Sequence, residues 1–175
     1  MYKTPAAILP AVLAIAACQT MGTPSEQVVG ETTLLRADGS TAGTVALVRE
    51  GDALAMRVNA SGLAGRSHGF HMHTAGRCEA PSFTSAGGHL NPGNRQHGLQ
   101  SASGAHLGDM PNLEPQGGTV RNGRIPVQGA ADATLAAIFD ADGTAVIIHA
   151  NPDDYVTDPT GNAGDRLACG VMQLR

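Results

Sequence analysis

The sequence lacks tryptophan, and aromatic residues make up only 3% of its 175 residues. A core built from this chain must therefore be aliphatic. Charged residues are also scarce, at 15% against 42% hydrophobic residues, which excludes a disordered polyelectrolyte. The formal net charge of -4 provides no positive excess for nucleic-acid binding, so we expect no nucleic-acid partner.

No lysine occurs beyond Lys3, and the apolar stretch 6–17 that follows this residue is too short to span a bilayer. One cation, a short apolar region and small residues at its end are typical of a secretory signal. The end reads Ile15-Ala16-Ala17-Cys18 and resembles a bacterial lipobox, which implies that Cys18 is lipidated and becomes the first mature residue. An ordinary signal peptide with an incidental cysteine is the alternative.

This signal divides the chain into three predicted parts: a lipoprotein signal peptide at 1–17, a polar tether at 18–27 and one folded domain at 28–175. Gln19 after Cys18 resembles the sorting pattern of outer-membrane lipoproteins. We therefore expect the periplasmic face of a bacterial cell envelope, with membrane contact only through the lipid on Cys18.

Export places the other two cysteines in an oxidising compartment. This favours a disulfide between Cys78 and Cys169 over two free thiols.

Short apolar or β-branched runs with turn signals between them predict about eight strands. They lie near residues 28–35, 44–49, 54–58, 69–73, 120 and 125–127, 134–139, 145–149 and 170–174. Asp-Gly and Asn-Gly pairs between neighbouring runs are hairpin signals. The spacing favours an all-β sandwich or barrel. The alanines of 130–137 would also suit a helical turn.

Two segments break this pattern and predict long loops. Residues 77–116 are rich in Gly, Pro, Ser and His without periodicity, and 151–168 form the second loop. Loops of this length inside a compact domain are usually functional. The metal-binding residue types in the first loop favour a loop ordered by a metal ion.

The positions of the histidines indicate how such a metal ion would be bound. His71 and His73 are two residues apart on a predicted strand, so their side chains share one face. The first loop adds three histidines and an aspartate, a set that suits a closed tetrahedral zinc site: His89, His97, His106 and Asp109. His149 ends an apolar strand where the second loop begins.

At these residues the chain resembles the copper/zinc superoxide dismutases, specifically the exported bacterial type. The resemblance covers 28–175 and is carried by the segments 69–73, 88–92, 97–98, 106–109 and 161–170. It implies an eight-stranded Greek-key barrel or flattened sandwich with two long functional loops. It also implies dismutation of superoxide to dioxygen and hydrogen peroxide by alternating reduction and oxidation of copper, with a structural zinc.

The resemblance also implies the site residues. Copper would be held by His71, His73, His89 and His149, and zinc by His89, His97, His106 and Asp109. His89 would thus bridge both metals and carry a proton in catalysis. Asp153 would link His71 to His97, and Arg166 would orient superoxide beside copper.

Other polar residues receive no such role. His68 is expected to be structural and to bond to the backbone, and Asp154 to be a solvated turn acid. The second loop lacks lysine, so the residues that steer superoxide besides Arg166 stay open, with Arg77 and Arg95 as candidates. A homodimer is compatible with the resemblance. The main alternative function is a non-catalytic, dismutase-like copper/zinc-binding envelope lipoprotein. A zinc hydrolase and a purely structural lipoprotein account less well for six spaced histidines.

Overall fold

The computed structural model describes residues 25–175. The predicted signal peptide, Cys18 and residues 18–24 of the tether lie outside the described residues. Within the described part, no helix is both long and apolar enough to cross a membrane.

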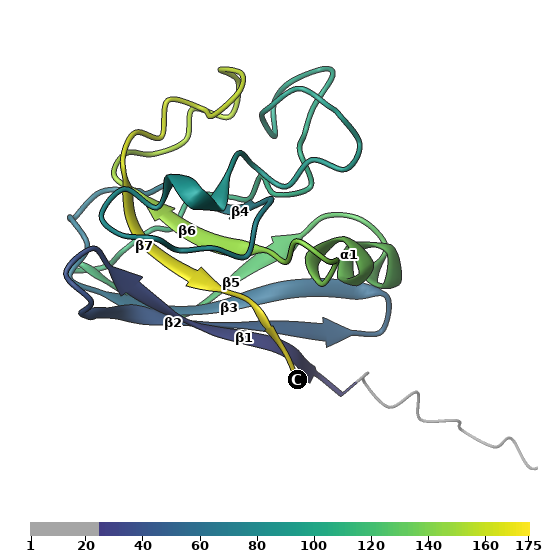
Figure 1. Cartoon of the computed structure of the whole chain (residues 1–175), viewed down its shortest axis with the longest axis horizontal. Coiled ribbons are helices and arrows are strands. Elements are labelled where there is room, and N and C mark those ends of the chain that lie inside the picture. Colours follow the sequence, from purple (N-terminus) through teal and green to yellow (C-terminus); the bar gives the residue numbers. More distant parts are fainter. Residues whose placement is uncertain (1–24) are drawn as a thin grey trace, which may run out of the picture.

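Eight antiparallel strands form one sheet that curls into a half-barrel (Figure 1). Along the sheet the order is β4-β6-β7-β1-β2-β3-β5, and β8 pairs with β1. The bounds are β1 Gln27–Arg36, β2 Thr41–Glu50, β3 Ala53–Ser61, β4 Phe70–His73, β5 Thr119–Val127, β6 Ala145–His149, β7 Arg166–Val171 and β8 Gln173–Leu174. The predicted all-β fold class is confirmed.

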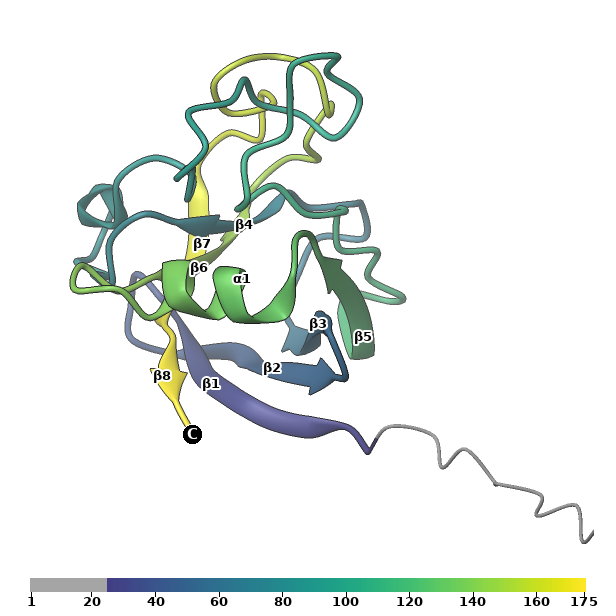
Figure 2. The same ribbon diagram turned by 90° about the vertical axis from the view of Figure 1, so that its right-hand side faces the viewer.

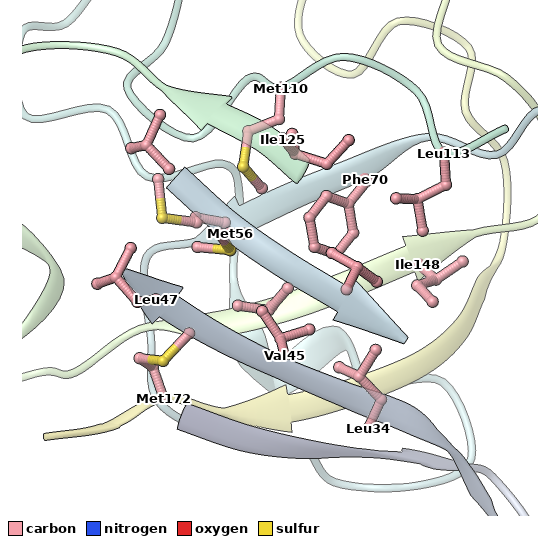
Figure 3. Packing of buried hydrophobic residues seen from close by; sticks show 14 of the residues in the cluster. Leu34, Val45, Leu47, Met56, Phe70, Met110, Leu113, Ile125, Ile148 and Met172 are labelled. Carbon is pink, nitrogen blue, oxygen red and sulfur yellow. The ribbon is translucent and has the colours of Figure 1, made fainter. Parts of the chain in front are cut away.

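Alternation along the strands builds the core. In β2 and β3 the inward positions are apolar, so that Val45 pairs with Val58 and Leu47 with Met56, all of them buried. Figure 3 shows Val45, Leu47 and Met56 packed against side chains from β1, β4, β5 and β6. As expected, the core is aliphatic, and Phe70 is its only aromatic side chain among the residues that Figure 3 labels.

Two predicted strands are wrong in detail. Residues 134–139 belong largely to helix α1, Ala131–Ile138, because burial there follows a helical spacing through Ala131, Thr134 and Ile138. Asn122-Gly123 does not turn a hairpin but lies within the continuous strand β5. Asn122 adopts the left-handed conformation, and β5 shifts register there against β3, so the Asn-Gly pair makes an irregularity instead of a reversal.

The two long loops lie side by side at one end of the half-barrel in both views (Figures 1 and 2). They follow β4 and β6, the strands at one side of the sheet. A backbone hydrogen bond from Gln100 to Tyr155 joins them at 3.0 Å. The disulfide between Cys78 and Cys169 is formed, and it ties the start of the first loop to β7.

Candidate metal centre

Neighbouring strands bring the first histidines together. His71 and His73 lie on one face of β4, and β4 pairs with β6, which ends at His149. An isolated backbone bridge joins His73 to His89 in the first loop. Four imidazoles that are far apart in sequence therefore meet at the end of two adjacent strands.

The candidate ligand atoms fall into two buried groups, within each of which all atoms lie no more than 4.8 Å apart. The copper group comprises His71, His73, His89 and His149, and the zinc group comprises His89, His97, His106 and Asp109. His89 belongs to both groups. These are the two predicted ligand sets, complete and with the predicted shared residue.

In the copper group, backbone carbonyls fix two of the rings. His73 Nδ1–H donates to the Gly87 carbonyl at 3.0 Å, and His149 Nδ1–H donates to the Gly164 carbonyl at 3.2 Å. Their Nε2 atoms consequently face each other at 3.3 Å as free lone pairs. Burial lowers the pKa of His149 to about 3 and that of His89 to about 4, so both rings are neutral at pH 7.

In the zinc group, Asp109 lies at the centre. Its Oδ1 is 2.8 Å from His89 Nδ1, 3.0 Å from His97 Nδ1 and 3.2 Å from His106 Nδ1. Its Oδ2 accepts the backbone N–H groups of Gly98 and His106 at 2.8 and 2.9 Å. Although burial alone would raise the pKa of Asp109, the hydrogen bond from His89 and the adjacent His97 ring hold it far below its usual range.

Unpaired nitrogens test whether metals fit these groups. His71 Nδ1, His89 Nε2 and His97 Nδ1 are buried and form no hydrogen bond. A buried polar atom without a partner is destabilising, and a metal ion in each group would satisfy these atoms. Four imidazole nitrogens suit Cu(II), and three with one carboxylate suit a closed zinc site. The residues therefore fit both metals.

Asp153 lies between the two groups. Its Oδ2 accepts from His71 Nε2 at 2.6 Å, and its Oδ1 accepts from His97 Nε2 at 3.1 Å. Sequence reasoning missed the residue that holds Asp153, since Asn112 carries no motif. The Asn112 side chain exchanges hydrogen bonds with the Asp153 backbone, accepting at 2.9 Å and donating at 3.0 Å.

Asp154 is exposed, as expected, yet it organises the second loop. Its carboxylate accepts from the backbone of Val156 and Thr157 and from Asn162 Nδ2, at 2.8 to 3.0 Å. Hydrogen bonds from Thr157 are the main reason that its pKa falls to about 2. Asp154 thereby fixes the side chain of Asn162, which lines the opening of the copper group.

That opening is a hollow of about 360 Å³. Its lining includes His73, His89, His149, Thr160, Asn162 and Arg166. Larger hollows of about 640 and 610 Å³ lie on the outer face of the sheet and beside α1, and neither is lined by a copper-group residue.

Arg166 stands at the edge of the copper hollow. Its guanidinium donates to the carbonyls of Phe83 at 2.6 Å and Gly87 at 2.7 Å. It forms no ion pair with any carboxylate of residues 25–175, so its charge is not neutralised locally. Arg95 donates instead to the Gly104 carbonyl and lines the hollow beside α1. Among the described residues, neither Arg77 nor Arg95 lines the copper hollow.

His68 lies outside both groups. Its Nδ1–H donates to the backbone carbonyl of His149 at 2.7 Å, and the ring is buried. This agrees with the expectation of a structural histidine bonded to the backbone.

Comparison with known proteins identifies relatives of this arrangement. A family model described as copper/zinc superoxide dismutase (SODC) matches residues 41–172. Superoxide dismutase [Cu-Zn] 2 of Aquifex aeolicus is 38% identical over 152 residues, covering 85% of this chain and 89% of that protein. The extracellular superoxide dismutase [Cu-Zn] of Haemonchus contortus is 35% identical over 141 residues, covering 77% of this chain and 74% of that protein.

Solved structures share the fold. A SOD-like protein from Bacillus subtilis matches with a TM-score of 0.68 and 37% identity, covering 81% of this chain and 96% of that chain. The Cu/Zn superoxide dismutase from Brucella abortus matches with a TM-score of 0.62 and 27% identity, covering 85% of this chain and 100% of that chain.

Proposed function

Because the chain belongs to the copper/zinc superoxide dismutase family and has both ligand sets complete, its activity is superoxide dismutation, and we propose which residues carry the reaction and where it takes place. The observation that carries the assignment is the pair of intact ligand groups sharing His89, with unpaired nitrogens in both. Copper, when bound, supplies the redox chemistry by which one superoxide becomes dioxygen and another, with two protons, becomes hydrogen peroxide.

Arg166 binds and orients superoxide in this proposal. Two carbonyls hold its guanidinium in place, and this leaves further N–H groups to donate to an anion in the copper hollow. A fixed cation at the edge of the hollow favours a monoanion over neutral molecules of the same size. Arg166 is thus the proposed substrate-binding residue.

His89 is the proposed proton carrier. Its Nδ1 points to Asp109 in the zinc group, whereas its Nε2 is unpaired in the copper group. A ring that serves both groups at once must be deprotonated on both nitrogens. An Nε2 atom not engaged by copper would take up a proton and would donate it to the substrate anion in the hollow that His89 lines.

Asp153 acts through the rings it holds and is a positioning residue. By accepting from His71 Nε2 and His97 Nε2, it selects the tautomer in which the Nδ1 of each ring faces its metal group. Both rings are thereby oriented before a metal binds.

We further propose an exported, lipid-anchored form. The lipobox-like sequence at Cys18, the Cys78–Cys169 disulfide and a relative named as extracellular support export. The lipid on Cys18 would hold the domain at the periplasmic face of the envelope, with the outer membrane favoured by Gln19.

The decisive experiment measures copper and zinc content together with superoxide consumption. The metal-loaded wild type should contain both metals and be active. His106→Ala should lose zinc and keep some copper, whereas His73→Ala should keep zinc and lose most activity. Full metal content without activity in the wild type would favour the non-catalytic metal-binding alternative, and intact zinc in His106→Ala would overturn the ligand assignment.

A further inference from the structure

The point where β1 begins carries exposed apolar side chains that the metal centre does not explain. Leu174 is 68% exposed and Val28 is 45% exposed, and Leu174 is the most exposed large apolar residue of those described. Leu174 in β8 pairs with Gly30 in β1, and the Arg175 N–H donates to the Val29 carbonyl at 3.0 Å. The end of the chain is therefore fixed beside the start of β1.

Ion-paired arginines surround the same point. Arg57 and Arg124 contact Glu26, and Arg124 also contacts Glu50. Arg49 contacts Asp132, and Arg175 contacts Glu31. Four carboxylates therefore balance the four arginines, and this surface carries no surplus of either charge. Long arginine side chains also keep their apolar stems at the surface. Exposed apolar side chains bordered by neutral ion pairs suit apolar contact with the headgroup region of a lipid bilayer.

The metal centre lies at the opposite end of the molecule. Figures 1 and 2, which differ by a quarter turn, both place the two long loops at one end and the start of β1 with the C-terminus at the other. The loops supply His89, His97 and His106, and they frame the copper hollow. The end of the molecule where β1 starts is here called the β1 pole.

Tether length decides which end faces a membrane. Eight residues lie between Cys18 and Gln27, and the nine Cα–Cα steps that join these two residues reach only about 30 Å even when fully extended. A domain of this size has a radius of gyration of about 15 Å, which corresponds to a diameter of about 40 Å. To bring the loops to the bilayer, the tether would have to follow about half the circumference, roughly 60 Å, which is twice its reach.

We propose that the β1 pole is a lipid-contacting surface, with Leu174 and Val28 at the headgroups, and that the copper hollow faces away from the membrane. This orientation rests on the lipid anchor proposed above. It places the hollow well beyond the Debye length of about 10 Å at 0.1 M salt, so anionic lipids would not repel incoming superoxide.

The chain contains no tryptophan, so all tryptophan emission from a variant comes from the one tryptophan introduced, and the orientation can be measured by its quenching. Leu174→Trp places the probe on the β1 pole, and Val156→Trp, at an apolar position in the second loop that is 55% exposed, is the matched control. Each lipidated variant is bound to phosphatidylcholine and phosphatidylglycerol vesicles whose acyl chains carry bromine. We expect emission from Leu174→Trp to be quenched at least severalfold more than emission from Val156→Trp. Equal quenching, or stronger quenching of Val156→Trp, would overturn the orientation.

Failure of the anchor is distinguishable from failure of the orientation. Intact mass shows whether Cys18 carries acyl chains, and Cys18→Ala versions of both variants should show no quenching. If Cys18 is not acylated, its thiol is coupled to a maleimide-bearing lipid, since Cys78 and Cys169 are already joined. The same quenching comparison then decides the orientation, while the anchor proposal has failed on the mass.

Discussion

Arg166 is the residue on which substrate attraction depends, because it is the only cationic side chain lining the copper hollow in the described part of the chain. Arg166→Ala should leave metal content intact and lower the second-order rate by about tenfold or more, equivalent to about 1.4 kcal/mol. The remaining rate should depend less on salt, since screening acts on the charge that is removed.

Stopped-flow measurement of superoxide decay at several ionic strengths checks this prediction. Arg95→Ala is the matched control, because Arg95 lines the hollow beside α1 instead, and its rate should equal that of the wild type. Arg166→Lys should recover part of the rate, since a point charge attracts the anion but lacks the planar donor pair. A full rate in Arg166→Ala would exclude the assignment.

The negative charge of Asp165 opposes the attraction of superoxide by the neighbouring Arg166. Its carboxylate is exposed and lines a hollow of about 500 Å³ that shares Gly164 and Arg166 with the copper hollow. At roughly 10 Å in water, one charge changes the energy of an approaching anion by about 0.4 kcal/mol, or about twofold in rate. Asp165→Asn should therefore speed dismutation about twofold at low salt, and the gain should vanish at high salt. A gain of the same size in Asp142→Asn, on an exposed turn outside both hollows, would contradict a local effect.

Zinc binding should be proton-coupled at His97. Burial alone would lower the pKa of this ring, but the neighbouring carboxylates of Asp109 and Asp153 raise it to about 9 in the metal-free protein. The raised pKa stabilises the metal-free fold below about pH 6.5, and this contribution is lost as the pH rises through about 9. Zinc requires the neutral ring, so zinc affinity should fall about tenfold per pH unit below about 9 from this proton alone.

Calorimetry of zinc binding at pH 7, in two buffers of different ionisation enthalpy, measures the protons released. We expect about one from His97, and none from His89, whose pKa burial lowers to about 4. Heats that do not depend on the buffer would show that His97 is already neutral and would contradict the prediction.

At the scale of the elements, the disulfide stabilises the position of the first loop rather than the pairing of the strands. It joins Cys78, at the start of the first loop, to Cys169 in β7, and the closed segment is long enough for a stabilisation of about 4–5 kcal/mol in the chain-entropy view. Reduction should therefore lower the melting temperature and expose first-loop amides to hydrogen exchange before those of β1 to β3. An unchanged melting curve, with both thiols confirmed free, would refute this.

A structural feature at this scale could be predicted from the sequence when the residues that determine it lie close together in the chain. Alternation in β2 and β3 is local, as is the sharing of one strand face by His71 and His73. The signal for the structure of 134–139 is not local, because alanine suits both a helix and a buried strand, and tertiary packing decides between the two. Likewise, Asn112 acquires its role only when the first loop meets Asp153 in the second. The complete ligand sets and Asp153 were predictable through the family resemblance, whereas Asn112, which holds Asp153, was not.

At the scale of the whole molecule, the charge that attracts superoxide and the arginines of the β1 pole lie at opposite ends. If residues 1–17 are removed as proposed, Lys3 goes with them, and ten cations remain against fifteen acids, a net charge of -5. Such a molecule repels superoxide at long range, and productive encounters depend on the local field at the loop end. The paired arginines of the β1 pole do not add to that field, since they lie at the opposite end of the molecule.

The carboxylate of Asp153, shared by one ring from each metal group, makes the two sites thermodynamically linked. A metal that binds to one ring changes the hydrogen bond which that ring donates to Asp153, and the other ring shares the same carboxylate. The coupling free energy must be the same in both directions, so zinc changes copper affinity by the factor by which copper changes zinc affinity. The two unlike ligands are therefore reciprocally coupled within a single subunit.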